Sequence, residues 1–326
     1  MSIAERVKGN PLLYELAKLI MHPLDRMKRE RFERQFKNYT YKDLMDYDAS
    51  LYYKRQGRNL NWKRLVTYTE KMQYEKLFNH NPIKSQLSDK VFVRSWVSER
   101  IGEEYLIPII GVYDRYKDIR FNDLPNQFVI KTNHGSGDVI IIKDKRNMSL
   151  ADRMRMKRII CDSMETNYAY FACEMHYSDI HPQIIIEKYI DSGNEDLQDY
   201  KFLCFGGKVY YCWVDVGRFH KHKRNIYDTE WNLQSWNQYN YGNYEKAIEK
   251  PKNFEKMLDI AQTLSQGFPH VRVDLYNIDG RIYFGEMTFT NGSGFEQLTP
   301  EYADKMLGGL WNMDTTLPDL NQTISQ

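Results

Sequence analysis

The fold prediction starts from HVRVDLYNIDGRIYFGEMT, residues 270–288. Apolar and polar residues alternate here, so Arg272 and Asp274 share one face of a β-strand. A three-residue turn at 278–280 pairs residue 277 with residue 281 and places Asp274 opposite Phe284. Glu286 then lies on the same face, diagonal to Asp274 at about 7–8 Å, and Thr288 follows it. The two carboxylates can hold divalent cations between them. The alternative is a polar strand face that only contacts water.

A second predicted hairpin has a glycine-rich tip. Strands are expected at residues 128–131 and 139–142, joined by Thr132-Asn133-His134-Gly135-Ser136-Gly137. Backbone N–H groups of such a tip can bind phosphate oxygens because no side chain blocks their approach, and Lys131 supplies a positive charge beside them. The tip is therefore a candidate phosphate lid, formed by His134, Gly135, Ser136 and Gly137. The alternative is an ordinary turn.

The remaining sequence is typical of a mixed α and β body. One helix is predicted after Ser88-Asp89-Lys90, and another begins at Ser149 and reaches about Met175. Further strands are expected at residues 106–112, 184–186, 201–205 and 209–214. No repeat or low-complexity linker divides the body, which indicates one compound α+β unit.

Residues 1–75 are predicted to form a basic helical extension. Leu12, Leu13, Leu16, Leu19 and Ile20 lie at helical spacing, and basic residues follow between positions 26 and 37. Either the apolar face packs on the rest of the protein, or the helix is an arm that lies on a membrane surface or an anionic partner.

Composition and missing motifs exclude several classes of protein. The length of 326 residues fits about two domains or one large compound domain. A net charge of +2 is too small for a dedicated nucleic-acid binder. The four cysteines form no C-x-x-C pair, which argues against a disulfide scaffold or zinc site and favours a reducing cytoplasm. We find no signal peptide, membrane span, P-loop, dinucleotide fingerprint, nucleophile elbow or zincin helix.

The order of these motifs resembles the ATP-grasp superfamily, and specifically its TupA-like (teichuronopeptide biosynthesis) branch. The stretches that carry the resemblance are residues 124–137, 199–205 and 272–288, and it covers about residues 68–311. It implies an α+β ATP-grasp fold in which two α/β subdomains sandwich the nucleotide. The implied body spans residues 76–313, with residues 120–188 as the lid subdomain and residues 314–326 as a tail.

The resemblance also implies a role for each candidate residue. Nucleotide phosphates would be held by Lys90 and Lys131, beneath the glycine tip. The adenine hinge would run from Glu187 to Ile190 and use the C=O of Lys188 and the N–H of Ile190. Two Mg²⁺ ions would be bound by Asp274 and Glu286, with Thr288 at a position where ATP-grasp enzymes commonly have Asn. The predicted catalytic residues are Lys201, Arg218 and Arg272, and of these Lys201 and Arg218 match basic positions that face the reacting acyl phosphate in related ligases.

The implied activity is an ATP-dependent carboxylate–amine ligation through an acyl phosphate. The implied partners are ATP, an amino acid or similar amine, and a uronic acid of a surface polysaccharide, free or as a lipid-linked or nucleotide-linked precursor. The basic run at residues 220–224 offers a contact for such a glycan. Asp46-Tyr47-Asp48, a D-x-D pair, keeps a glycosyltransferase open as an alternative, as are a glycan kinase and a non-catalytic binding module.

Overall fold

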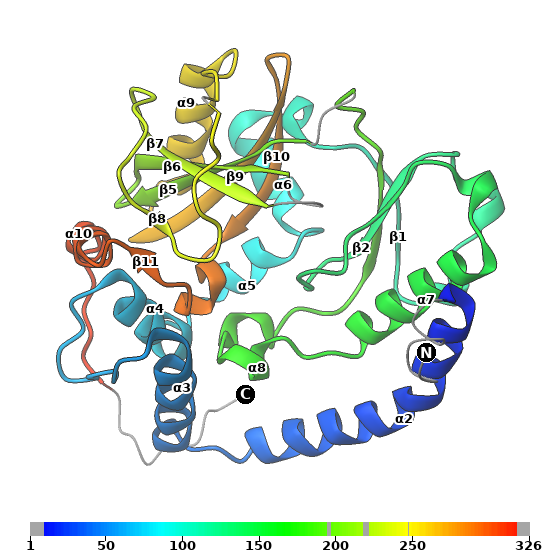
Figure 1. Ribbon diagram of the computed structural model, residues 1–326, viewed down its shortest axis with the longest axis horizontal. Helices are drawn as coiled ribbons and strands as arrows, with labels where there is room; N and C mark the ends of the chain where they lie inside the picture. Colours follow the sequence, from blue (N-terminus) through cyan, green and yellow to red (C-terminus); the bar gives the residue numbers. More distant parts are fainter. Residues whose placement is uncertain (1–9, 194–196, 218–221, 247, 318–326) are drawn as a thin grey trace.

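A computed structural model describes residues 10–193, 197–217, 222–246 and 248–317. Its largest sheet has five antiparallel strands in the order β10-β9-β5-β6-β7 (Figure 1). These strands are β5 (Asp199–Phe205), β6 (Lys208–Val216), β7 (Lys223–Asp228), β9 (His270–Ile278) and β10 (Arg281–Thr288). The predicted hairpin around Gly206 and Gly207 is thus confirmed as β5 and β6.

A second sheet contains the glycine tip. Its four strands have the order β1-β4-β2-β3, and all neighbours are antiparallel. The strands are β1 (Ile109–Tyr113), β2 (Phe128–Thr132), β3 (Ile140–Ile142) and β4 (Ile184–Lys188). The predicted hairpin at residues 128–142 is confirmed, and β1 joins this sheet although it precedes the predicted lid range of 120–188.

Helices surround the two sheets (Figure 1). The α-helices are α2 (Pro11–Phe36), α3 (Tyr41–Gln56), α4 (Tyr68–Phe78), α5 (Pro82–Ser88), α6 (Val93–Ile101), α7 (Leu150–Met164), α8 (Ala169–Ala172), α9 (Phe254–Ser265) and α10 (Tyr302–Leu310). Short 3₁₀ turns are η1 (Glu103–Tyr105), η2 (Tyr116–Asp118), η3 (Phe121–Asp123), η4 (Lys145–Asn147), η5 (Met175–Tyr177) and η6 (Asn291–Gly294). A small third sheet pairs β8 (Asn237–Gln238) with β11 (Leu298–Thr299).

The helix predicted from Ser149 begins as expected but ends early. Ser149 and Asp152 form a reciprocal capping box at the start of α7. The helix ends at Met164 rather than near Met175, and the separate α8 ends at Cys173 in a left-handed conformation. The apolar pattern continues across this break because the residues that follow α7 also enter the core, so periodicity alone misses it.

Each main sheet has its own apolar core. One face of the five-stranded sheet packs on α9, where Phe202, Val273 and Leu264 are buried. The four-stranded sheet packs on α7 through Phe128, Ile186 and other buried residues. Lys201, Asp215 and Asp274 alternate with buried residues of this core and therefore project from the face of the sheet opposite α9.

The pairing of β9 with β10 differs from the predicted register. The turn has two residues, Asp279 and Gly280, both with positive φ, so Ile278 pairs with Arg281. A β-bulge at Gly285 then shifts the register by one, and Glu286 lies directly opposite Asp274. The predicted pairing of Asp274 with Phe284 was therefore wrong. The turn is one residue shorter than predicted, and the bulge was not predicted. Each of these changes shifts the register by one residue, which moves a side chain to the other face, so the two together return Glu286 to the face of Asp274.

Gly285 allows the close approach of the two strands at the bulge. A Cβ atom added there would lie 3.0 Å from the backbone oxygen of Asp274. The close approach of the two strands at this point is what places the Asp274 and Glu286 side chains opposite each other.

Candidate active site

Arg272 joins the two predicted metal ligands. Its Nε and Nη2 atoms donate to Asp274 Oδ1 and Oδ2 at 2.6 and 2.7 Å, and Nη2 also reaches Glu286 Oε1 at 3.0 Å. Thr288 Oγ1 lies 3.1 Å from the same Nη2 atom and donates to Glu286 Oε1 at 2.9 Å. The side-chain oxygens of Asp274, Glu286 and Thr288 therefore converge on one point, which the Nη2 atom of Arg272 occupies.

The electrostatics of the two acids differ. Asp274 is buried, and this burial raises the pKa of its carboxyl, while Arg272 and Lys201 oppose the rise. The side chain of Glu286 is 40% exposed. Although burial alone would raise its pKa, the positive charges of Arg272, Lys90 and Lys201 lower the pKa of Glu286 to about 2. Glu286 is thus ionised at neutral pH.

The charged network continues across the sheet beyond the predicted residues. Lys201 Nζ lies 2.7 Å from Asp274 Oδ2 and 2.5 Å from Asp199 Oδ2. On the next strand, Asp215 accepts two hydrogen bonds from Arg224, at 2.5 and 2.7 Å. Asp199, Asp215 and Arg224 were missed as site residues. Asp215 lies between Val214 and Val216, and that spacing would have placed it on the polar face, whereas Arg224 lies between Lys223 and Asn225 and its strand carries no such signal.

Arg224 also corrects one interpretation of the basic run. It is buried and paired with Asp215, so it does not offer a charge to an approaching glycan. Residues 218–221, which include the predicted catalytic Arg218, lie outside the described residues.

Asn291 lies near the position where Thr288 replaces the usual Asn. Its Oδ1 accepts a hydrogen bond from Arg272 Nη1. Asn291 is buried in η6, directly after β10. It therefore helps to fix the guanidinium, while Thr288 supplies the hydroxyl next to Glu286.

The glycine tip is anchored at its base and exposed at its end. Asp138 accepts hydrogen bonds from the N–H and hydroxyl of Thr132 and from Ser163 of α7. His134 is buried against α7, whereas Ser136 and Gly137 are exposed. Burial lowers the pKa of His134, so its ring is neutral at pH 7. Within the tip, only the Ser136 and Gly137 end is open to a ligand.

Lys90 interacts with residues of both sheets. Its Nζ donates to the Gly135 carbonyl at 2.8 Å, beneath the glycine tip. Burial lowers the pKa of Lys90, and the negative charge of Glu286 is the strongest influence opposing this. Lys131 is also close enough to lower the pKa of Lys90 further. The two predicted phosphate-binding lysines and the carboxylate hairpin thus belong to one electrostatic neighbourhood.

The predicted hinge begins with a buried ion pair. Glu187 Oε2 lies 2.7 Å from Lys131 Nζ, and Glu187 Oε1 lies 3.6 Å from Arg94, a site residue that the sequence analysis missed. The N–H of Lys188 donates to the Pro108 carbonyl at 2.9 Å. This bond fixes the strand end that leads to the predicted adenine contacts, the Lys188 carbonyl and the Ile190 N–H.

The donor set fits a hard divalent cation. Among the described residues, no cluster of three or more His, Cys, Asp or Glu side chains could hold a metal. Mg²⁺, however, commonly takes only one or two protein carboxylates and completes its shell with phosphate oxygens and water. Asp274 and Glu286 supply these two carboxylates, and Thr288 adds a neutral hydroxyl.

The D-x-D alternative loses its geometric basis. Asp48 is fully buried in α3 and forms an ion pair with Lys76 at 2.7 Å, whereas Asp46 is exposed. The two carboxylates therefore do not present themselves together to a metal-bound sugar nucleotide.

Neither of the two cavities described for the chain is lined by a predicted site residue. One, of about 270 Å³, lies between the N-terminal helices, α5 and η5, and Tyr41, His80 and His176 are among its lining residues. The other lies around Gly206 and Gly207, next to Leu258 and Gln262 of α9. Arg272, Lys201 and Asp274 of the candidate site are buried, whereas the side chain of Glu286 is 40% exposed.

Comparison with known proteins supports the motif-based resemblance. A family model described as TupA-like ATPgrasp matches residues 70–312, close to the predicted extent. No curated protein sequence matches the chain. Among solved structures, the chain is similar to a D-alanine–D-alanine ligase from Bacillus anthracis complexed with ATP, at 17% identity and a TM-score of 0.35, over 62% of this chain and 53% of that one.

Two further solved structures are similar to the chain. The ATP-grasp ligase PsnB, complexed with a precursor variant, Mg and ADP, matches at 10% identity and a TM-score of 0.35, over 64% of this chain and 51% of that one. The D-cycloserine synthetase DcsG matches at 14% identity and a TM-score of 0.37, over 71% and 72%. The chain spans about half the length of the D-alanine ligase and PsnB chains.

Proposed function

The chain belongs to the TupA-like ATP-grasp family, and we propose that it is an ATP-dependent, ADP-forming carboxylate–amine ligase that works through an acyl phosphate. One observation carries the proposal. The oxygens of Asp274, Glu286 and Thr288 converge on a single point. Lys90 is close enough to Glu286 and Lys131 to interact electrostatically with both, and it donates to Gly135 of the glycine tip. Such a set fits a magnesium-bound triphosphate.

The phosphate-binding part of the reaction falls to the lysines and the tip. Lys90 and Lys131 neutralise phosphate oxygens, and the exposed end at Ser136 and Gly137 closes over them. Mg²⁺ held by Asp274 and Glu286 would neutralise charge on the transferred phosphoryl group. Closure also excludes water, which would otherwise hydrolyse the acyl phosphate.

Each step forms one bond and breaks one at the reacting atom. A carboxylate oxygen of the first substrate attacks the γ-phosphorus of ATP, and the bond to the bridging oxygen breaks to release ADP. The amine nitrogen then attacks the acyl carbon, the acyl C–O bond breaks to release phosphate, and the departing phosphate takes up the proton that the nitrogen loses. Arg272 and Lys201 stabilise negative charge at the acyl phosphate, and their buried partners Asp274 and Asp199 hold them in position.

The proposed substrates are an amino acid or similar amine and a uronic acid of a surface polysaccharide, free or as a lipid-linked or nucleotide-linked precursor. Membership in the TupA-like family supports this choice. We place the reaction in the cytoplasm, where ATP is supplied and where the cysteines Cys161, Cys173, Cys204 and Cys212 stay as thiols, as they are in this structure. No helix in the described part of the chain is long and apolar enough to cross a bilayer.

The test is ADP release from Mg-ATP with a panel of amino acids and uronic-acid acceptors, followed by mass analysis of the product. ADP together with a new amide supports the ligase. ADP without an amide indicates a kinase or ATPase, and no ADP with any pair indicates a binding module. Asp274→Asn should abolish ADP release, whereas Asp46→Asn, a matched change at an exposed acid, should not alter it.

A further inference from the structure

The outer face of α2 carries a continuous row of exposed apolar side chains. Their exposed fractions range from 37% for Leu12 to 78% for Ile20. The row consists of Leu12, Leu13, Leu16, Leu19, Ile20, Met21, Leu24 and Met27. Most of these residues recur at the spacing of one helix face, and residues 12–27 extend over about 24 Å at 1.5 Å per residue.

The inner face of the same helix is polar. Glu15 is buried and accepts two hydrogen bonds from Arg158 of α7, at 2.8 and 3.1 Å. About two turns further along α2, His22 pairs with Asp162. About two turns beyond that, Arg29 donates to Glu165 at 3.2 Å. These contacts with α7 fix which side of α2 faces the protein (Figure 1).

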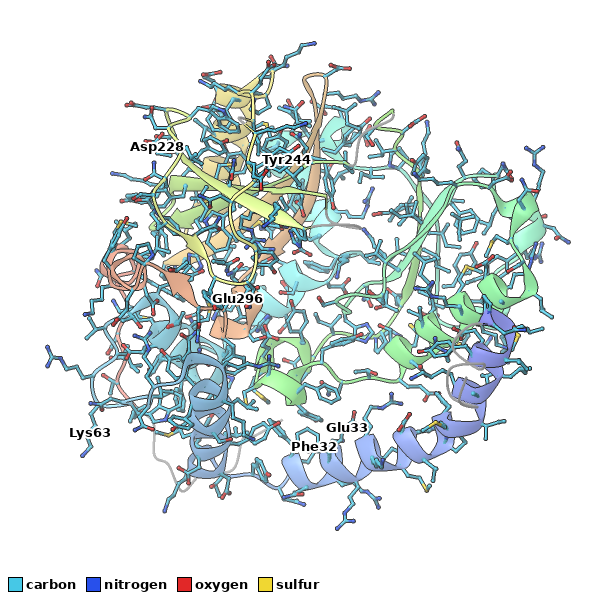
Figure 2. The ribbon with its side chains drawn as sticks, viewed as in Figure 1. Phe32, Glu33, Lys63, Asp228, Tyr244 and Glu296 are labelled. Atoms are coloured by element: carbon cyan, nitrogen blue, oxygen red, sulfur yellow. The ribbon has the colours of Figure 1, made fainter. Side chains whose placement is uncertain are left out.

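Aromatic packing holds the other end of α2 in the same orientation. Phe36 is buried, and its ring lies 4.7 Å from that of Tyr170. Phe32 packs on Tyr47 and Phe171. Figure 2 shows Phe32 and Glu33 on the side of α2 turned toward the rest of the molecule. The interpretation that α2 packs its apolar face on the protein was therefore wrong, because ion pairs and two phenylalanines occupy the inner face.

Charge identifies what can cover the exposed row. The outer side of α2 continues from Met27 into exposed basic residues, Lys28, Arg31 and Arg34. Glu30, the acid among them, is engaged by Arg26 at 2.8 Å. A face of large aliphatic side chains followed by lysine and arginine matches a helix lying in the interface of an anionic membrane.

We propose that α2 docks the protein on an anionic membrane surface. The side chains of the apolar row enter the acyl boundary, and Lys28 and Arg31 contact acidic lipid headgroups. The exposed side of α2 faces the membrane, since α7 covers its other side. This inference does not rest on the proposed ligase activity.

The test is co-sedimentation of the full chain with phosphatidylcholine vesicles, with and without about a third phosphatidylserine. Binding should require phosphatidylserine and weaken with salt. Ile20→Asp should reduce binding at least about tenfold. The single variants Lys28→Gln and Arg31→Gln should each reduce binding about fivefold. Leu233→Asp, at a similarly exposed leucine outside α2, is the matched control and should bind normally.

Three results would overturn the proposal. One is binding that Ile20→Asp leaves unchanged. Another is equal binding to vesicles without phosphatidylserine. The third is a self-association in solution that Ile20→Asp abolishes, which would identify the row as an interface between copies of the chain. Because Ile20 is exposed, its variant should keep the wild-type unfolding temperature and the same ADP release with soluble substrates, so failure here is distinguishable from failure of the proposed function.

Discussion

Replacing Glu286 by Gln separates metal binding from folding better than any other change in the site. Its side chain is 40% exposed and contacts Arg272 and Thr288. A pKa lowered from 4.5 to about 2 corresponds to about 3 kcal/mol, but solvent screening at this exposure reduces the contribution to about 1 kcal/mol. Because the folded-state pKa is the lower one, this stabilisation is present above pH 4.5 and is lost as the pH falls toward 2.

The effect on activity should be much larger. Loss of one of two carboxylate ligands removes about 3–4 kcal/mol of charge stabilisation, so kcat/KM for ADP release should fall about 10²–10³-fold. The measurements are ADP release at fixed Mg-ATP and the free energy of unfolding in urea at pH 7. Glu301→Gln, at an exposed glutamate on the surface, is the control and should change neither. The reasoning fails if Glu286→Gln keeps activity within about threefold, or if it lowers the free energy of unfolding by more than about 3 kcal/mol.

Three further predictions test other parts of the molecule. Lys131→Met should weaken binding of an ATP analogue about 10–100-fold by calorimetry, whereas Lys117→Met, at an exposed side chain in η2, should not; an affinity that Lys131→Met leaves unchanged would remove Lys131 from the site. Asp48→Asn strands the fully buried charge of Lys76 and should cost about 3–5 kcal/mol of unfolding free energy without changing ADP release per folded molecule, and a specific loss of activity would contradict this. Burial lowers the pKa of His270 from 6.5 to about 3, so protonation favours the unfolded chain below pH 6.5. The contribution of His270 to the free energy of unfolding should therefore be complete above pH 6.5 and fall by about 2 kcal/mol at pH 5. His270→Gln should remove this part of the pH dependence in urea titrations, and an unchanged dependence would refute the prediction.

Local features of the fold were predictable from the sequence. The hairpins β2–β3, β5–β6 and β9–β10 have strands rich in β-branched and aromatic residues and glycine-containing turns, and both signals act between neighbours in the chain. The capping box at Ser149 is equally local. The bulge at Gly285 was not predictable in this way, because an isolated glycine within a strand is compatible with several registers.

Features that depend on distant partners were missed. Arg224 and Asp215 become site residues only because β7 pairs with β6 beside β5. The orientation of α2 depends on Arg158, far along the chain, which binds Glu15 and turns the leucines outward. Amphipathicity shows that a helix has two faces, but it does not show which face meets the protein.

The balance of charge in the candidate site bears on how a nucleotide can bind. Three of its cations are already matched by acids, Lys201 and Arg272 by Asp199 and Asp274, and Lys131 by Glu187, while Lys90 donates to the Gly135 carbonyl. A triphosphate that entered alone would have to displace carboxylates from these partners or add uncompensated negative charge to a largely buried network. A triphosphate that brought divalent cations would avoid both costs, since Asp274 and Glu286 would hold the metal and Arg272 would be free to bind phosphate. On this argument, the ion pairs seen here hold the ligands and the basic groups in position for a metal–nucleotide complex.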